Sequence, residues 1–463
     1  MNYFKNKYFI GVFIILIAVI FTGQLCGKSE PYPDAVTLQF WGVFDEEEYF
    51  SESIEQFQTQ FPYVTIEYTK FRPEEYEKEL KDAWARGEGP DLYAVPNYKM
   101  GEFKQFSAPL PATMNLKTVT VKETLGKSDV SVETKALKGI TDKQLYTLFP
   151  DVVGSDVIFS DQTEDEKTAT NKIFGLPLSV DTLAMYYNKD LLNQAQIAIP
   201  ATTWAEFLDQ VKSISTIDKD GSIVRSGTSL GTANNIPRVF DIVSILMMQN
   251  GATMADGNSV RFDLDSETQD GYYPGIAAAD FYTSFADPNR ESYSWNENLP
   301  EALEYFSLGN IGFFFGYHYH LAEIKEANPN LNFDIAELPQ VDMENIINYA
   351  NYWNYSVSTN SANSDLAWYF IQNLTTNEEN AKFYLDKTEQ PAALKSLIPG
   401  QEDIFEVQVF NNQTLTSQSW YHGKEPNAAD AFMKEMITAI NDGTLTLEEA
   451  VETTASKIEL TFQ

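Results

Sequence analysis

Hydrophobic positions near the start of the chain alternate between strand-like and helix-like spacing. Short β-strands are expected at residues 36–41, 64–68 and 92–95. The intervening segment carries an apolar stripe with helical spacing, formed by Phe50, Ile54, Phe57 and Phe61. A second helix is expected to begin at Pro73, because proline favours the first helical turn, and to end at Gly87. This β-α-β-α-β order predicts an open parallel sheet.

The segment from Phe174 to Asp190 has the pattern of a chain that crosses between two lobes. A Gly-Leu-Pro turn leads into an apolar strand, and the sequence Tyr-Asn-Lys at 187–189 then opens a helix. Thr203 and Glu206 have the spacing of a capping box in front of another amphipathic helix. The pattern therefore predicts that a second α/β unit begins close to residue 181.

This order of motifs resembles the extracellular solute-binding proteins of carbohydrate ABC importers, the maltose-binding-protein-like members of family 1. The glycine-rich segment before three phenylalanines at 306–315 and the closing helix signal at 443–450 fit the same family. The resemblance implies a periplasmic-binding-protein-like class II α/β fold. Two discontinuous lobes would be joined by a hinge, with a ligand cleft between them at the carboxyl ends of strands.

The resemblance also implies how the chain is divided. Residues 1–29 are expected to be a signal peptide or membrane anchor. The first lobe is expected at 31–180 and 335–384, with an irregular polar insertion at about 112–172, which we interpret mostly as a surface excursion. The second lobe is expected at 181–334 and 385–463. Residues 333–339 resemble the strand that returns to the first lobe.

The N-terminus predicts export. Lys5 and Lys7 precede an apolar run from Tyr8 to Phe21, which is the pattern of a signal sequence. The single cysteine, Cys26, follows this run and excludes a disulfide within one chain. Cys26 is either a site of lipid attachment or an incidental thiol after an uncleaved helical anchor. Both alternatives place the folded part outside the cytoplasmic membrane, at the cell surface or in a periplasm.

The net charge of −35 limits the choice of partners. Such an acidic chain of 463 residues repels nucleic acid and anionic lipid headgroups, so no nucleic-acid partner is expected. The length exceeds what one hydrophobic core usually fills, in agreement with two lobes. A monomer without cofactor is expected.

Three local motifs suggest catalysis or metal binding, and each has a simpler explanation. The sequence at 227–231 fits a nucleophile elbow around Ser229, but a loop-like stretch follows where a helix would be needed. His318, His320 and His422 form no recognisable zinc set, and the Asp218 turn lacks the glutamate of a calcium loop. No spacing selects a pair of carboxylates for glycoside hydrolysis. We therefore predict neither enzymatic chemistry nor a metal site.

Aromatic residues are the most informative class, because a sugar presents C–H faces that stack on aromatic rings and hydroxyls that need polar partners. Trp84, Trp204 and Trp368 lie in predicted helices and are expected in the core. Candidates at strand ends are Trp41, Phe44, Asn97, Tyr98, Trp353 and Asn354. The family resemblance adds Asp181 and Tyr319, and Trp295 and Trp420 are weaker candidates.

The sequence thus predicts an exported binding protein, not an enzyme. It would capture a carbohydrate, most simply an oligosaccharide, and deliver it to the membrane subunits of an ABC permease. Two alternatives stay open: an exported glycan-directed hydrolase, and a surface adhesion protein on the same fold. Turnover of a glycan would identify the first, and an interlobe space blocked by apolar side chains would favour the second.

Overall fold

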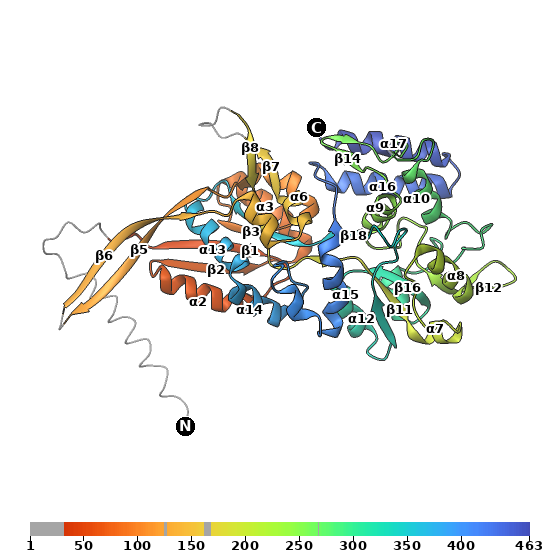
Figure 1. Cartoon of the computed structure of the whole chain (residues 1–463), viewed down its shortest axis with the longest axis horizontal. Helices are drawn as coiled ribbons and strands as arrows, with labels where there is room; N and C mark the ends of the chain where they lie inside the picture. The colour runs from red at the N-terminus through yellow and green to blue at the C-terminus, as the bar shows by residue number, and fades with distance from the viewer. Residues whose placement is uncertain (1–31, 125–126, 162–167, 267) are drawn as a thin grey trace, which may run out of the picture.

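The computed structural model describes residues 32–463 except 125–126, 162–167 and 267. The predicted signal or anchor segment and Cys26 lie outside the described residues. Within the described part, no helix combines the length and the apolar character that crossing a membrane requires. The chain forms two α/β lobes side by side, and a β-hairpin projects from the first (Figure 1).

The first lobe contains a six-stranded sheet in the order β2-β1-β3-β19-β4, with β9 also paired to β19. Strands β1 (Val36–Gly42), β2 (Val64–Lys70) and β3 (Leu92–Pro96) are parallel, as predicted. Strand β19 (Trp353–Ser358) runs antiparallel to β3 and is flanked by β4 (Ser107–Ala108) and β9 (Leu176–Pro177). The covering helices are α2 (Ser51–Gln60), α3 (Pro73–Arg86), α13 (Ser364–Thr376) and α14 (Glu378–Thr388).

Local sequence rules explain these elements. The four stripe residues Phe50, Ile54, Phe57 and Phe61 are all buried. Helix α3 has proline in its first turn and ends at Gly87, whose φ of 74° is left-handed and favours glycine. Trp84 and Trp368 lie in the core, as predicted.

The second lobe has a five-stranded sheet in the order β12-β13-β16-β11-β17. Its strands are β11 (Ala184–Asn188), β12 (Thr216–Ile217), β13 (Ile223–Thr228), β16 (Ile311–Gly316) and β17 (Phe333–Ala336). The predicted helix start at Asn188 and the capping box of Thr203 and Glu206 are both present, at α7 (Lys189–Gln194) and α8 (Trp204–Ile214). The other main helices are α9 (Val239–Gln249), α10 (Pro274–Thr283), α11 (Ala302–Ser307), α12 (His320–Ala327), α15 (Phe405–Gln413), α16 (Pro426–Asn441) and α17 (Leu447–Leu460).

Three connections join the lobes through a small sheet in the order β10-β18-β20. Its strands are β10 (Asp181–Thr182), β18 (Asn348–Asn351) and β20 (Ser417–Gln418). The chain passes from the first hydrophobic core to the second between Val180 and Leu183. It returns to the first core between Tyr349 and Ala350, and it enters the second core again between Ile398 and Phe410.

The second and third passages of the chain between the two cores lie at other residues than the expected lobe boundaries. Strand β17 pairs with β11 in the second lobe, so residues 335–338 have not yet returned to the first lobe. The expected boundary at 384–385 falls within α14, and the chain packs in the first core up to Ile398. A strand start and a hydrophobic helix face do not by themselves reveal which core they join.

The expected insertion is more ordered than its polar sequence suggests. It forms two hairpins, β5 (Thr113–Thr124) with β6 (Lys127–Lys138) and β7 (Ile158–Asp161) with β8 (Thr170–Ile173). Between them lie α5 (Asp142–Leu148) and α6 (Asp151–Val157). Leu145, Val153 and Val157 are fully buried in the first core. The interpretation as a surface excursion is therefore wrong for the two helices, whose apolar positions were too few to reveal a helical period.

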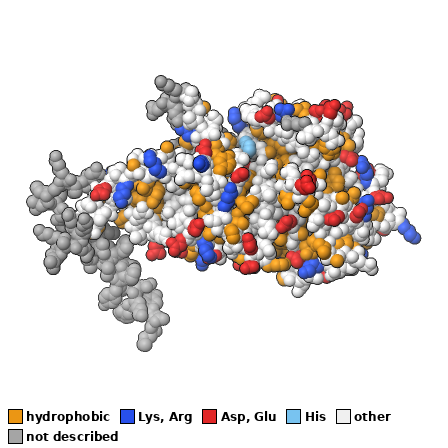
Figure 2. Space-filling model, in the orientation of Figure 1, with side chains coloured by type: hydrophobic (Ala, Val, Ile, Leu, Met, Phe, Trp, Pro, Cys, Tyr) orange, Lys and Arg blue, Asp and Glu red, His pale blue; other side chains and the backbone are white. Residues whose placement is uncertain are grey.

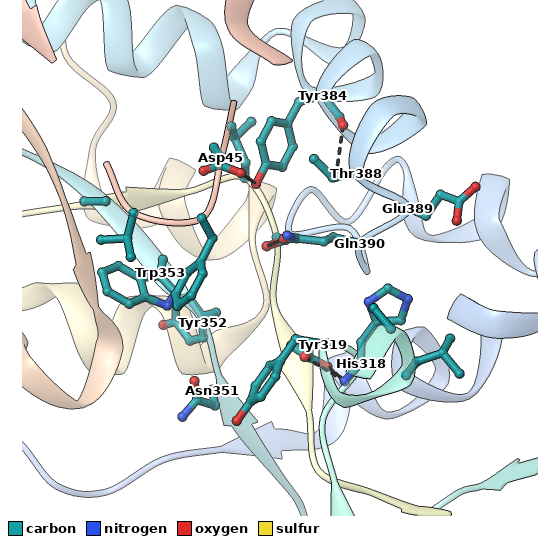
Figure 3. A pocket seen from close by; sticks show the side chains of 18 of the residues that line it. Asp45, His318, Tyr319, Asn351, Tyr352, Trp353, Tyr384, Thr388, Glu389 and Gln390 are labelled. Atoms are coloured by element: carbon teal, nitrogen blue, oxygen red, sulfur yellow. Dashed lines mark hydrogen bonds between the residues drawn. The ribbon is translucent and has the colours of Figure 1, made fainter. Parts of the chain in front are cut away.

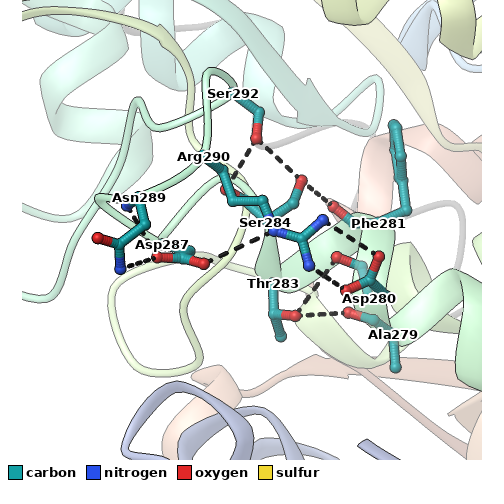
Figure 4. A network of polar contacts seen from close by, with 9 residues as sticks. All are labelled: Ala279, Asp280, Phe281, Thr283, Ser284, Asp287, Asn289, Arg290 and Ser292. Atoms are coloured by element: carbon teal, nitrogen blue, oxygen red, sulfur yellow. Dashed lines mark hydrogen bonds and ion pairs between the residues drawn. The ribbon is translucent and has the colours of Figure 1, made fainter.

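A polar network shapes the loop after α10 in the second lobe (Figure 4). Arg290 pairs with Asp280 at 2.6 Å, and the hydroxyl of Ser292 donates to the carbonyl of Ser284 at 2.9 Å. Exposed ion pairs of this kind add little stability. Their effect is local order in the loop that leads to the fully buried Trp295.

Candidate ligand-binding cleft

A cavity of about 790 Å³ lies between the lobes and is lined by side chains from both (Figure 3). This volume is within the range of small-molecule sites in proteins. The polar or aromatic lining residues used below are Phe44, Asp45, Tyr98, Asp181, Arg238, Tyr319, Trp353, Tyr355 and Tyr384.

The first-lobe wall is built at the carboxyl ends of the parallel strands. Phe44 follows β1, and Tyr98 follows β3. Trp353 begins the antiparallel strand β19 and lies opposite Pro96 at the end of β3, so it reaches the same edge of the sheet. The rings of Phe44 and Trp353 meet edge to face with centroids 5.5 Å apart, and 58% of Phe44 is exposed. Open aromatic surface therefore faces the cavity.

Asp45 holds two tyrosines of the first-lobe wall by hydrogen bonds. Its carboxylate accepts hydrogen bonds from the hydroxyls of Tyr355 at 2.9 Å and Tyr384 at 2.8 Å. Burial raises the pKa of Asp45 above its ordinary value, although both phenol donors oppose that shift. Asp45 was not among the predicted site residues. An aspartate three residues after a strand end carries no pattern that identifies distant tyrosine partners.

The second-lobe wall centres on Tyr319, which precedes helix α12 and is 46% exposed. Its ring stacks on that of Tyr317 with centroids 5.9 Å apart. Asp181 approaches from the hinge sheet and accepts a hydrogen bond from the backbone N–H of His318 at 2.9 Å. Burial raises the pKa of Asp181 to about 8, and the backbone donors at His318 and Thr182 oppose the shift.

Arg238 brings the two walls into contact. It precedes α9 with a left-handed φ of 58°, a conformation that non-glycine residues rarely adopt. Its guanidinium pairs with Asp241 at 2.6 Å and lies 5.1 Å from the ring centroid of Tyr98 on the first lobe. No sequence signal placed Arg238 in the site, although a non-glycine residue in such a backbone often marks a functional position.

Comparison with known proteins identifies the family. The family model for bacterial extracellular solute-binding proteins matches residues 43–381. The chain belongs to this family. Its class II fold agrees with that of a binding protein for cyclic α-maltosyl-1,6-maltose from Arthrobacter globiformis, with a TM-score of 0.70 and 14% identity over 92% of this chain and 99% of that chain. The resemblance inferred from the sequence motifs is confirmed.

Two further proteins are similar to this solute-binding protein. The crystal structure of a cyclo/maltodextrin-binding protein complexed with maltotetraose has a TM-score of 0.66 and 18% identity, over 94% of this chain and 98% of that chain. A galactooligosaccharide-binding protein from Bacillus subtilis is 22% identical over 315 residues, which is 65% of this chain and 70% of that protein. At these identities the structural matches establish the fold alone.

Five of the eight predicted ligand-binding residues line the cavity of this solute-binding protein: Phe44, Tyr98, Asp181, Tyr319 and Trp353. The other three do not. Trp41 packs on Phe71 at 4.6 Å between ring centroids. Asn97 is buried, and its amide donates to Asp156 at 3.0 Å. Asn354 is buried within β19.

Strand geometry explains why Asn354 was misplaced. Successive side chains of a strand point to opposite faces, so the neighbour of a cleft residue turns away from the cleft. The weaker candidates Trp295 and Trp420 are also buried in the second core.

His320, His422 and the elbow serine occupy structural positions, whereas His318 lines the cavity. His320 accepts a hydrogen bond from the backbone N–H of Tyr317 at 2.9 Å, and burial lowers its pKa to about 3. His422 pairs with Asp156 at 3.0 Å, away from the cleft. In the part of the chain that the structure describes, no three histidine, cysteine or acidic residues are grouped to hold a metal. Ser229 is 1% exposed, and β13 is not followed directly by a helix.

Proposed function

We propose that this solute-binding protein is the carbohydrate-binding component of an ABC importer, which closes its lobes on an oligosaccharide and delivers it to the permease. The observation that carries the proposal is the pairing of aromatic surface from both lobes across one cavity, with Trp353 and Phe44 on one side and Tyr319 on the other. Rings on opposite walls match the two apolar faces of a pyranose.

Polar groups beside these rings suit the hydroxyls of a sugar. Arg238 and Asp181 reach the cavity from the second lobe and the hinge. Arg238 can form charge-assisted hydrogen bonds, and Asp181, whose pKa burial raises to about 8, can donate and accept as a neutral carboxyl. The ligands of similar proteins, a galactooligosaccharide and maltotetraose, favour an oligosaccharide over other solutes. We therefore place the ligand between Trp353 and Tyr319, with its hydroxyls directed to Arg238 and Asp181.

We further propose that the protein binds its ligand without chemical change. The family is one of binding proteins, and the buried Ser229 has no exposed surface from which to attack a substrate. A glycan hydrolase is the competing function. Incubation of the purified protein with labelled glycans distinguishes the two, because any turnover lost on mutation of a cleft carboxylate contradicts binding alone.

We also propose that the protein is exported and held at the membrane. The apolar run of residues 8–21 and Cys26 support tethering to the outer face of the cytoplasmic membrane, by the segment itself or by a lipid on the cysteine. We propose a monomer there, in contact with the permease only during delivery.

A thermal-shift screen of residues 30–463 against sugars and peptides tests the ligand class. A ligand present at 100 times its Kd adds about 2.7 kcal/mol to the free energy of unfolding, so an oligosaccharide should raise the unfolding temperature by several degrees. Solution scattering with the same ligand should then show a smaller radius of gyration, because hinged lobes close on it. Stabilisation by peptides alone, or by no solute, would contradict carbohydrate binding.

A further inference from the structure

The cavity between the lobes continues beyond its aromatic walls into a polar region. His318, Thr388 and Gln390 line the cavity there. In Figure 3 the ring of Tyr319 points toward Asn351. The ring of His318 points the other way, toward the side of the cavity where Thr388 and Gln390 lie. These two neighbours in the sequence therefore face different parts of one cavity.

His318 offers a neutral imidazole to the polar region. Its backbone N–H donates to Asp181, and its ring packs edge to face on Phe410 with centroids 5.3 Å apart. Among the described residues, neither ring nitrogen has a hydrogen-bond partner. Burial lowers the pKa of His318 to about 4, so at neutral pH the ring has one N–H donor and one nitrogen acceptor. This pair suits a sugar hydroxyl, which also donates and accepts.

Gln390 is held in place on the opposite side of the polar region. Its side-chain oxygen accepts a hydrogen bond from the hydroxyl of Ser179 at 2.6 Å, which leaves the amide NH2 without a partner in the described part of the chain. The backbone is fixed on both sides of this residue. Glu389 turns the chain at the end of α14 with a left-handed φ of 53°, and the carbonyl of Pro391 accepts from the N–H of Val180 at 3.2 Å. Gln390 therefore presents two free donors from a rigid segment.

Both lobes contribute to the polar region. Thr388 and Gln390 lie at and just after the end of α14, which packs in the first core, whereas His318 lies between β16 and α12 of the second lobe. A sugar ring held here would contact both lobes, as would the ring between Trp353 and Tyr319. Two adjacent rings can therefore make contacts that one ring cannot.

Acidic side chains are spread over the visible face of both lobes (Figure 2), and they also prevail around the cavity. In the described part of the chain, the lining has two basic side chains, Arg238 and Lys325. Each already has a carboxylate partner, at Asp241 and Glu406 respectively. The acidic residues of the lining are Asp45, Asp181, Glu323, Glu389 and Glu406. A uronic acid would thus bring its carboxylate into a negative field that has no free cation, so the charges favour an uncharged ring.

We propose that His318 and Gln390 form a second sugar subsite, which binds an uncharged ring by hydrogen bonds while the aromatic walls hold the neighbouring ring. The inference rests on the proposed carbohydrate function. The hydroxyl of Thr388 donates to the carbonyl of Tyr384 at 3.0 Å and keeps an acceptor for the same ring. The preferred solute is then a neutral disaccharide or longer chain, because a single ring fills only one of the two subsites.

Calorimetric titration of the full chain in detergent tests the subsite. The probes are maltose, cellobiose, lactose and β-1,4-galactobiose, with glucose and galactose as the single rings. The parent protein should bind at least one disaccharide about tenfold more tightly than either single ring. His318→Phe keeps a ring on Phe410 but removes both nitrogens, and Gln390→Met removes the amide at similar length. Each should weaken binding of that disaccharide about fivefold, in keeping with lost hydrogen bonds to one ring, and leave the single rings within about twofold.

Two further variants serve as controls. His318→Gln keeps a donor and an acceptor, so it should lose less affinity for the disaccharide than His318→Phe. Gln56→Met makes the same change as Gln390→Met at an exposed position of α2 and should leave all affinities unchanged. Urea unfolding checks that each variant is folded, and Gln390→Met tests the subsite on its own should His318→Phe fail to fold.

The possible failures are distinguishable. Affinity for the disaccharide within about twofold of the parent in both variants overturns the subsite and leaves carbohydrate binding intact. Equal losses for single rings and disaccharides also overturn it, because one ring would then contact these side chains. A parent protein that binds none of these sugars contradicts the carbohydrate function, and the subsite with it. Binding of digalacturonic acid as tight as that of the best neutral disaccharide would overturn the preference for an uncharged ring.

Discussion

The two lobes form their walls of the cleft by different structural routes. The first lobe uses strand ends, where Phe44, Tyr98 and Trp353 share one edge of a sheet braced by Asp45. The second lobe uses the start of α12 and the left-handed residue Arg238, both held by polar contacts to the hinge and to Asp241. The first wall is thus fixed by the strands of its sheet and by one buried carboxylate, and the second by a few polar contacts at its surface. Mutations in the two walls should therefore differ in their effects on the free energy of unfolding and on the affinity for sugar.

The largest expected effect is on the first wall. Asp45→Ala removes the acceptor of two buried tyrosine hydroxyls and should lower the free energy of unfolding by about 2–4 kcal/mol. Urea unfolding followed by far-UV circular dichroism measures this loss. Asp45→Asn keeps one acceptor oxygen and should cost less. A loss of less than about 0.5 kcal/mol in the free energy of unfolding of Asp45→Ala would mean that the sheet edge does not depend on these hydrogen bonds.

The aromatic residues allow a direct comparison of the walls. Trp353→Ala and Tyr319→Ala should each weaken binding of the sugar found in the screen by about 1–3 kcal/mol, because each removes a stacking face. Calorimetric titration gives the affinities.

Trp84→Phe is the control for these two variants. Its indole donates to Ser358 at 2.9 Å in the first core, so the change should lower stability and leave affinity intact. Unchanged affinity in both cleft variants would place the ligand elsewhere.

The contrast between the walls also explains what the sequence reveals. Strand ends are visible in the pattern of apolar residues, so Phe44, Tyr98 and Trp353 could be placed in the cleft before the fold was known. Trp41 and Asn354 were misplaced because the pattern locates a strand end without fixing which side chains turn toward the ligand.

The second wall was accessible mainly through family resemblance. That resemblance supplied Asp181 and Tyr319. Asp45 depends on Tyr355, which is 310 residues away in the sequence, and Arg238 contacts Tyr98 of the other lobe, so no local pattern connects either residue to a cleft. Backbone conformation at Arg238 is likewise set by the fold and not by its neighbours in sequence.

A smaller effect is expected at the contact between the walls. Arg238→Lys keeps the charge that faces Asp241 but loses the planar group that lies over Tyr98. Binding should weaken by about 0.5–2 kcal/mol, in keeping with one partly buried cation–π contact. Titration of Arg238→Lys beside Arg290→Lys, which changes a surface arginine in the same lobe, measures the difference. Equal affinities in the two variants would show that Arg238 does not contribute to the ligand site.

The smallest effect is expected for Asp181→Asn, and it should depend on pH. Because the pKa of Asp181 in the folded protein is raised to about 8, this group favours folding fully below its unfolded pKa near 4, and the contribution is lost as pH rises toward 8. Asparagine keeps an acceptor for the N–H of His318 but does not titrate. The decline in unfolding temperature from pH 5 to pH 8 should therefore be shallower in Asp181→Asn than in the parent protein. At pH 6, below the raised pKa of Asp181, the two should bind sugar within about 0.5 kcal/mol of each other, because a protonated carboxyl and an amide both offer a donor group and an acceptor oxygen. A large loss of affinity at pH 6 would mean that the carboxylate is ionised in the cleft, and the second wall would then bind its ligand through a full charge.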